Sequence, residues 1–239
     1  MVNYDIGLER ENIITFTSFD LRSKHEAVVE KLEQYPDAMD VTATITPITA
    51  TASRWGREYE GKDYMVHVWT VRWNMPQFFG IQVIEGEEFT EQSGSRRDMI
   101  VSLNLHTEIG IPVGYNELSS YKVTGIAKDV RLNAVTNDNI YTAFCCNAKQ
   151  NLSTFYIKLR EGADIKDFAM YIKDLVQEFA PGADEPEVEF FDQAVANLYN
   201  STKKATVTIG LFALLAVVIA LMGVFGIVMF ETQHRRSEI

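Results

Sequence analysis

The sequence contains little cysteine and little histidine, which argues against disulfide-rich and metal-binding classes of protein. Two of its 239 residues are cysteine and four are histidine. Cys145 and Cys146 are adjacent, a spacing that rarely permits an ordinary disulfide, and no third or fourth ligand is spaced near them for a metal site. We interpret the pair as small apolar residues on a strand. His67, His106 and His234 are isolated in the sequence, so no metal ligands are expected there either.

Positive charge is scarce as well. The chain has 22 lysine and arginine residues against 33 aspartate and glutamate residues, a net charge of −11. Such an acidic surface repels phosphate backbones and anionic lipid headgroups, so nucleic acid is not an expected partner. The first ten residues, MVNYDIGLER, lack the basic region and apolar stretch of a signal peptide, so we expect either a cytoplasmic domain or a fragment of a longer protein.

Motifs for catalysis are incomplete where they occur. The stretch GREYEGKD at 56–63 matches the opening of a phosphate-binding loop, but Asp63 replaces the serine or threonine that would bind Mg²⁺. The stretch HEAVV at 25–29 lacks the second histidine of a zinc-protease helix. No serine lies in a nucleophile pattern. We therefore expect no catalytic residue, no cofactor and no metal, and the chain is predicted not to be an enzyme.

What the sequence does contain is a long apolar run near its end. Residues 205–230 include no charged residue, and residues 207–230 are almost wholly apolar. As a helix the latter would extend about 36 Å, against about 30 Å of bilayer hydrocarbon. A buried helix of a soluble protein normally shows a polar stripe, and this run shows none. We predict a transmembrane helix over 207–230.

Small residues form one stripe along this predicted helix. At 100° per residue they fall within an arc of about 140°, and helices in lipid pack where small residues let backbones approach. The predicted packing face consists of Ala213, Ala216, Ala220, Gly223 and Gly226. We expect it to contact other membrane helices that this sequence does not contain.

The residues before the apolar run predict a stiff connection to it. Asp192 can cap a helix, and neither glycine nor proline interrupts the chain between it and the apolar run. Our hypothesis is one unbroken helix from 193 to about 234, roughly 60 Å long, in which residues 193–206 form a stalk. The stalk residues at helical spacing are Gln193, Val195, Leu198 and Tyr199.

The first part of the chain predicts a strand-helix-strand unit. Strands are expected at 12–19 and 39–46. Between them, Ser23 and Glu26 have the spacing of a capping box, and the apolar residues that follow recur at helical spacing until Pro36.

A second unit of the same order is predicted near the end of the acidic part. Strands at 153–160 and 187–191 flank a helix that Asp164 can cap and Pro181 ends. The two units together predict an α+β lobe, in which two helices cover one face of a sheet. Its two halves are residues 1–46 and 153–192.

Residues 47–152, between the two units, are predicted to be mostly β. Alternating or apolar strand candidates are broken by glycine, proline and asparagine, and they lie at 64–73, 98–103, 121–130 and 140–146. The simplest architecture inserts this β-rich lobe between the halves of the α+β lobe.

Several stretches taken in order resemble one family of membrane proteins. The segment WTVRWNMPQFFGIQVIEGEEF (69–89) resembles a signature of the extracytoplasmic domain of MacB-like and FtsX-like ABC-transporter permeases. The segments that follow it in that family resemble MIVSLNLHTEIGIPVG (99–114) and YKVTGIAKDVRLNAV (121–135). Residues 190–239 are similar to the family's junction from the periplasmic domain into its second transmembrane helix.

This resemblance implies a role and a location. It implies a two-lobed extracytoplasmic domain in a non-catalytic permease subunit of the bacterial inner membrane, with residues 1–206 extracytoplasmic and residues 231–239 at the cytoplasmic start of the next segment. ATP hydrolysis is expected in a separate ATPase subunit or domain. The implied partners are this cytoplasmic ATPase, other permease helices, a second permease copy, and an envelope partner or exported substrate.

A different class of protein also fits the pattern. The extracytoplasmic sensor of a transmembrane signalling receptor likewise places an α+β domain before a stiff helix and a membrane span. That alternative predicts a kinase or cyclase downstream, whereas the permease predicts further apolar spans.

Overall fold

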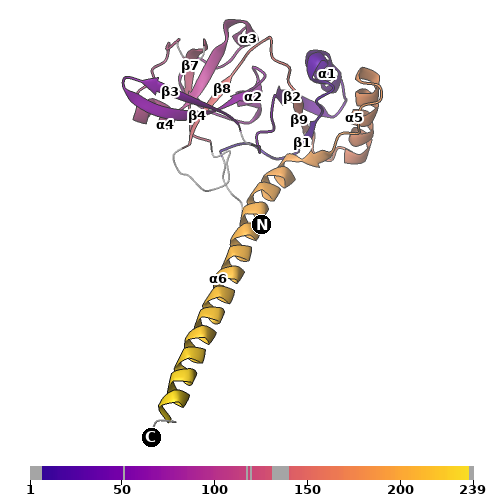
Figure 1. Ribbon diagram of the computed structural model, residues 1–239. Helices are drawn as coiled ribbons and strands as arrows, with labels where there is room; N and C mark the ends of the chain where they lie inside the picture. The colour runs from indigo at the N-terminus through magenta and orange to yellow at the C-terminus, as the bar shows by residue number, and fades with distance from the viewer. Residues whose placement is uncertain (1–6, 51, 117, 119, 131–139, 237–239) are drawn as a thin grey trace. The chain divides into compact units, whose positions relative to one another are not determined.

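The computed structural model describes residues 7–50, 52–116, 118, 120–130 and 140–236 (Figure 1). The chain divides into two compact units, Met1–Val195 and Ala196–Ile239.

The first unit contains a four-stranded antiparallel sheet with helices on one face. Its strands are β1 (Ile13–Thr17), β2 (Ala38–Thr44), β9 (Thr154–Leu159) and β10 (Val188–Phe190), in the order β10-β1-β9-β2. Helices α1 (His25–Glu33) and α5 (Ile165–Phe179) lie side by side in Figure 1 and share one apolar core with the sheet. Alternate strand residues such as Ile14, Phe16 and Ile157 belong to that core.

The two helices begin in different ways. The side chain of Asp164 accepts hydrogen bonds from the backbone N–H groups of Lys166 (2.9 Å) and Asp167 (3.2 Å), so α5 has the cap that the sequence indicates. The capping box predicted at Ser23 is wrong. Ser23 lies in a 3-10 turn, Arg22–Lys24, and α1 begins at His25 with no side-chain cap. The side chain of Leu21 is buried, and its carbonyl accepts a hydrogen bond from the N–H of Lys24 (2.9 Å), which fixes this turn.

A six-stranded mixed sheet forms the other part of this unit. Its strands are β3 (Ser53–Tyr59), β4 (Lys62–Thr70), β5 (Val83–Gly86), β6 (Asp98–Ser102), β7 (Lys122–Ala127) and β8 (Tyr141–Cys145), in the order β3-β4-β8-β6-β7-β5. Strands β4 and β8, and β6 and β7, run parallel. The short helices are α2 (Met75–Phe78), α3 (Ser93–Arg96) and α4 (Leu103–Ile109). The predicted α+β class is confirmed, and the chain leaves the first sheet after β2 and returns to it at β9.

Two sequence features of this sheet have simple structural roles. The stretch at 56–63 is part of a β-hairpin whose turn residues Glu60 and Gly61 both have positive φ, so Gly61 serves a turn and Gly56 lies in strand β3. Cys145 ends β8 and Cys146 follows it; both thiols are free and buried. Burial raises the pKa of both, which keeps them protonated and unreactive.

The two sheets are joined by hydrogen bonds between β2 and the segment after β4. The backbone N–H of Arg72 donates to the carbonyl of Ala43 (2.8 Å). The side chain of Asn74 accepts from the hydroxyl of Thr42 (2.9 Å) and donates to the carbonyl of Val41 (2.9 Å). Asn74 and Thr42 are buried. Because buried polar groups are costly when unpaired, these bonds hold the two sheets in a fixed register.

The long helix α6 runs without a break over Phe191–Arg236, 46 residues, or roughly 69 Å at the usual rise. It begins two residues earlier than the predicted start at Gln193, so Asp192 lies in its first turn rather than at its cap. The strand predicted to reach residue 191 ends at Phe190, the last residue paired with β1. Phe191 starts the helix instead, because its ring is buried among other rings.

Gly86 provides a test of the six-stranded sheet. It has φ of +82°, and a Cβ atom there would lie 2.2 Å from the carbonyl oxygen of Thr124 on the paired strand β7. Gly61 has a similar φ of +77° but no atom within 4 Å of such a Cβ. We expect Gly86→Ala to lower the free energy of unfolding by about 3 kcal/mol and Gly61→Ala by about 1 kcal/mol, because only the first adds a clash to the backbone strain.

Thermal unfolding of the full chain in detergent, followed by tryptophan fluorescence, measures this difference. Trp55, Trp69 and Trp73 all belong to the first unit, so the signal reports that unit. Equal losses for the two variants would show that close backbone approach does not constrain the β5–β7 pair.

Candidate functional site at the start of the long helix

Three aromatic rings meet where α6 begins. The ring centroid of Phe191 lies 5.1 Å from that of Phe79 and 5.6 Å from that of Tyr156, and those of Phe79 and Tyr156 are 5.2 Å apart. All three side chains are fully buried. We call this set the aromatic cluster. Two of its three contacts are edge-on or nearly so, the geometry that aromatic pairs favour.

Phe79 is held by the turn that follows α2. Its backbone N–H donates to the carbonyl of Met75 (3.1 Å), and Gly80 then takes a φ of +69°, which turns the chain away. The N–H of Ile81 closes the turn on the carbonyl of Pro76 (2.8 Å). Phe79 thus projects from the connection between strands β4 and β5 of the six-stranded sheet.

Tyr156 is held by a central strand. It pairs with Thr15 of β1 on one side and with Thr42 of β2 on the other. Its hydroxyl accepts a hydrogen bond from the backbone N–H of Ile48 (2.8 Å), in the segment that leaves the first sheet. Burial raises the pKa of Tyr156 to about 12, so the hydroxyl is neutral at physiological pH.

The N-terminal segment of the described chain is tied to the same place. The N–H of Glu9 donates to the carbonyl of Phe79 (2.8 Å), and its carboxylate pairs with Lys158 of β9 (2.7 Å). The guanidinium of Arg10 lies 3.8 Å from the carboxylate of Asp192, in the first turn of α6. The start of the domain and the start of α6 are therefore held by one group of contacts.

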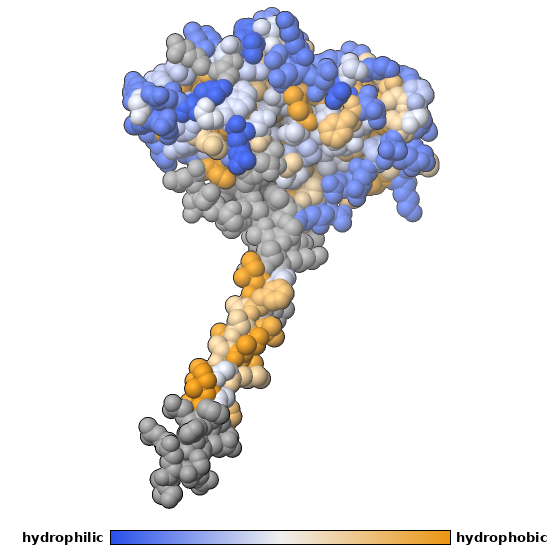
Figure 2. All heavy atoms as spheres, in the orientation of Figure 1, coloured by the Kyte–Doolittle hydropathy of each residue, from blue (hydrophilic) through white to orange (hydrophobic). Residues whose placement is uncertain are grey.

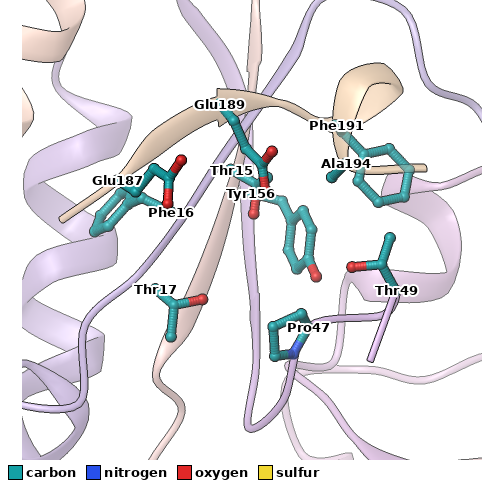
Figure 3. A pocket seen from close by; sticks show the side chains of 10 residues that line it. All are labelled: Thr15, Phe16, Thr17, Pro47, Thr49, Tyr156, Glu187, Glu189, Phe191 and Ala194. Atoms are coloured by element: carbon teal, nitrogen blue, oxygen red, sulfur yellow. The ribbon is translucent and has the colours of Figure 1, made fainter. Parts of the chain in front are cut away.

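A cavity of about 160 Å³ lies beside the aromatic cluster (Figure 3). Its lining combines apolar residues, among them Phe191 and Ala194, with hydroxyl and carboxylate groups. The cavity is lined by Thr15, Phe16, Thr17, Pro47, Thr49, Tyr156, Glu187, Glu189, Phe191 and Ala194. Tyr156 and Phe191 therefore belong both to the aromatic cluster and to the lining of this cavity.

The predicted stalk residues have mixed surroundings. Val195 is buried and Gln193 is exposed, which places the first turns of α6 against the unit on one side only. The side chains of Leu198 and Tyr199 lie outside the part of the chain that the structure describes. Within the described residues, no group of three histidine, cysteine, aspartate or glutamate side chains is placed to hold a metal ion.

The apolar part of α6 is exposed over its described length. Among the described residues, one helix is long and apolar enough to cross a membrane: Thr208–Val228, 21 residues with a mean hydropathy of 3.0 and no buried side chain. Figure 2 shows its apolar side chains on the visible face. The five small residues of the predicted packing face all lie in this stretch and are exposed.

Sequence reasoning did not find the aromatic cluster. Phe79 lies in the quoted signature at 69–89, and its aromatic pair before Gly80 was the available signal. Tyr156 and Phe191 were assigned to strands, where aromatic residues are common. Nothing local to any of the three indicates that these segments, separated by 35 to 112 residues, converge.

Comparison with known proteins identifies the family. A model of the MacB-like periplasmic core domain matches residues 3–175, well over half of the chain. A search of curated protein sequences found no match. The periplasmic region of MacB from Actinobacillus actinomycetemcomitans has a similar structure, with a TM-score of 0.57 at 14% identity, covering 79% of this chain and 92% of that one.

A second solved structure is also similar. The extracellular domain of the noncanonic ABC-type transporter YknZ from Gram-positive bacteria aligns with a TM-score of 0.49 at 13% identity, covering 74% of this chain and 98% of that one. The family match and the likeness to the MacB fold agree with the two sheets and the helix pair described above. The chain belongs to the family of MacB-like periplasmic core domains of ABC-transporter permeases.

Proposed function

We propose that this chain transmits ATPase-driven motion across a membrane to an extracytoplasmic domain, as the non-catalytic part of an ABC-transporter permease. The work done would be export, lipoprotein release or activation of an envelope partner. ATP would be hydrolysed by a cytoplasmic ATPase subunit or domain that contacts other parts of the permease. In this proposal residues 1–206 are extracytoplasmic and residues 207–230 cross the bacterial inner membrane.

One observation carries the proposal: a single helix contains both the buried Phe191 and the apolar stretch Thr208–Val228. A helix without an internal glycine hinge or proline transmits displacement along its axis, because each turn is hydrogen-bonded to the next. No proline occurs in α6, and its first glycine is Gly210, within the apolar stretch. Movement of the apolar stretch would therefore reach Phe191.

The aromatic cluster explains how such movement would be shared between the two sheets. Phe79 continues from the strands of the six-stranded sheet, and Tyr156 belongs to the four-stranded sheet. Removing a buried aromatic ring from its packing costs about 3–5 kcal/mol, several times the thermal energy. A displacement of Phe191 would thus move both neighbours rather than slip past them.

The predicted packing face has a role in the same proposal. Ala213, Ala216, Ala220, Gly223 and Gly226 would contact other helices of the permease or a second permease copy. Contact through small residues lets two backbones approach closely, so that a rearrangement of one helix is passed to its neighbour.

The first test replaces Phe191. In the full-length permease reconstituted with its ATPase, ATP binding should change the amide exchange of peptides from β9 and α2. We expect Phe191→Leu to reduce this change by at least half, because leucine fills most of the volume but loses the ring contacts, at a cost of about 1 kcal/mol in stability. The rate of ATP hydrolysis should stay within about twofold, since the substitution leaves the ATPase intact.

Phe19→Leu is the matched control, because Phe19 is 66% exposed and lies outside the aromatic cluster. It should leave the ATP-dependent exchange as in the unmodified protein. If Phe191→Leu behaved like this control, α6 would not pass motion through the aromatic cluster, and the proposed route would be wrong.

The second test replaces small residues of the packing face. We expect the triple substitution Ala216→Leu, Ala220→Leu and Gly223→Leu to abolish the ATP-dependent exchange difference, because bulkier side chains separate the helices. Tryptophan fluorescence should show unchanged unfolding of the first unit. Val218→Leu with Phe225→Leu forms the control pair, since both lie on the opposite side of the helix at 100° per residue. Equal behaviour of the triple and control variants would refute the packing face.

A further inference from the structure

Two carboxylates lie on the strand that leads into α6. Glu187 precedes β10 and Glu189 is its middle residue, and side chains two residues apart on extended chain point to the same side. Both line the cavity beside the aromatic cluster, and Figure 3 shows both on the cavity side of β10. Glu189 is followed after one residue by Phe191, so its charge lies at the point where α6 is attached.

Neither carboxylate has a counter-ion among the described side chains. In the part of the chain that the structure describes, no ion pair or hydrogen bond includes the side chain of Glu187 or Glu189. The groups that face Glu189 across the cavity are the hydroxyls of Thr15 on β1, Tyr156 on β9 and Thr49 in the segment after β2. None of these carries a charge at neutral pH, since the pKa of Tyr156 is about 12.

The charged groups of the adjoining segments are paired with one another. Arg10 lies against Asp192 of α6 (3.8 Å), and Lys158 of β9 is bound to Glu9 (2.7 Å). The first turn of α6 contributes only Phe191 and Ala194 to the cavity. Glu189 therefore faces neutral hydroxyls, apolar side chains and the like charge of Glu187.

These surroundings favour the neutral carboxyl group. Burial raises the pKa of Glu189, and the charge of Glu187 raises it further. Ionisation of Glu189 places a second negative charge in a partly buried cavity whose described lining contains no cation. The cost falls on β10, which has three residues and is paired on one side only, with β1.

We propose that Glu189 is a proton-responsive residue that controls how firmly β10 and the first turn of α6 pack on the sheet. When Glu189 is protonated the junction is tight; when it is ionised beside Glu187 the junction loosens. The regulatory meaning of this switch rests on the proposed transmission through α6. The switch itself is a property of the cavity and can be tested without transport.

The sign of the effect follows from proton linkage. A carboxyl group whose folded pKa is raised binds its proton more tightly in the folded state than in the open one. Its stabilising contribution is complete below the ordinary glutamate pKa and is lost as pH rises through the folded value. Raising the pH from mildly acidic to neutral should therefore loosen β10, whereas a glutamine at 189 should remove the dependence.

Amide exchange of the full chain in detergent, between about pH 4 and pH 8, tests this directly. After correction for intrinsic exchange rates, protection of residues 188–195 should fall by about threefold or more over that range in the unmodified protein. Glu189→Gln should keep the high protection of the acidic sample at every pH. Glu187→Gln should show a reduced dependence, because it removes the neighbouring charge but leaves Glu189 partly buried.

Glu85→Gln is the matched control, since Glu85 is an exposed carboxylate on β5, the edge strand of the other sheet. It should leave the pH dependence at residues 188–195 unchanged. A protection that does not vary with pH in the unmodified protein, or that varies equally in Glu189→Gln, would overturn the proposal. Either result would leave the Phe191→Leu test of transmission unaffected, so the two proposals can fail separately.

Discussion

The burial of one ring, that of Phe191, is the constraint on which the rest of this structure depends. A three-residue edge strand ends at Phe190, and the next residue begins a helix of 46 residues. Among the described residues, the buried side chains of α6 are Phe191, Ala194 and Val195, all in its first turns. Phe191 is the largest of the three side chains, and its ring contacts Phe79 and Tyr156 from segments of both sheets.

The face of the four-stranded sheet opposite its two helices limits where the ring of Phe191 can pack. That face is rich in buried threonine, and its hydroxyls are paired: Thr17 with Thr154 (3.0 Å), and Thr42 with Asn74 (2.9 Å). Such a face cannot accept an arbitrary apolar helix without leaving hydroxyls unpaired, at about 1–3 kcal/mol each. The apolar part of the face is concentrated at Tyr156, so Phe79 and Phe191 have one place to pack.

Local sequence patterns predict the parts of the fold whose contacts are local, and they fail where distant segments meet. The alternation in β1, β2 and β9 and the cap at Asp164 indicate elements that exist, because a single sheet face and a single helix end determine them. The capping box at Ser23 is equally regular as a pattern, yet the buried Leu21 imposes a 3-10 turn there. The start of α6 at Phe191 depends on Phe79, which lies 112 residues away in the sequence, and no local propensity contains that information.

A short strand before a long helix also makes the junction sensitive to small energies. Each ladder hydrogen bond contributes only about 0.5–1.5 kcal/mol net, and β10 has three residues that pair on one side. The side chains here contribute opposing free energies, because aromatic packing stabilises the junction and the unpaired carboxylates destabilise it. Each of these contributions is comparable with the sum of the backbone hydrogen bonds of β10. If the domain moves as a body with α6, as we propose, the aromatic packing must contribute more than the unpaired carboxylates remove. In the same proposal, Glu187 and Glu189 near Phe191 keep that margin narrow, so that the attachment of the helix responds to pH while both sheets remain folded.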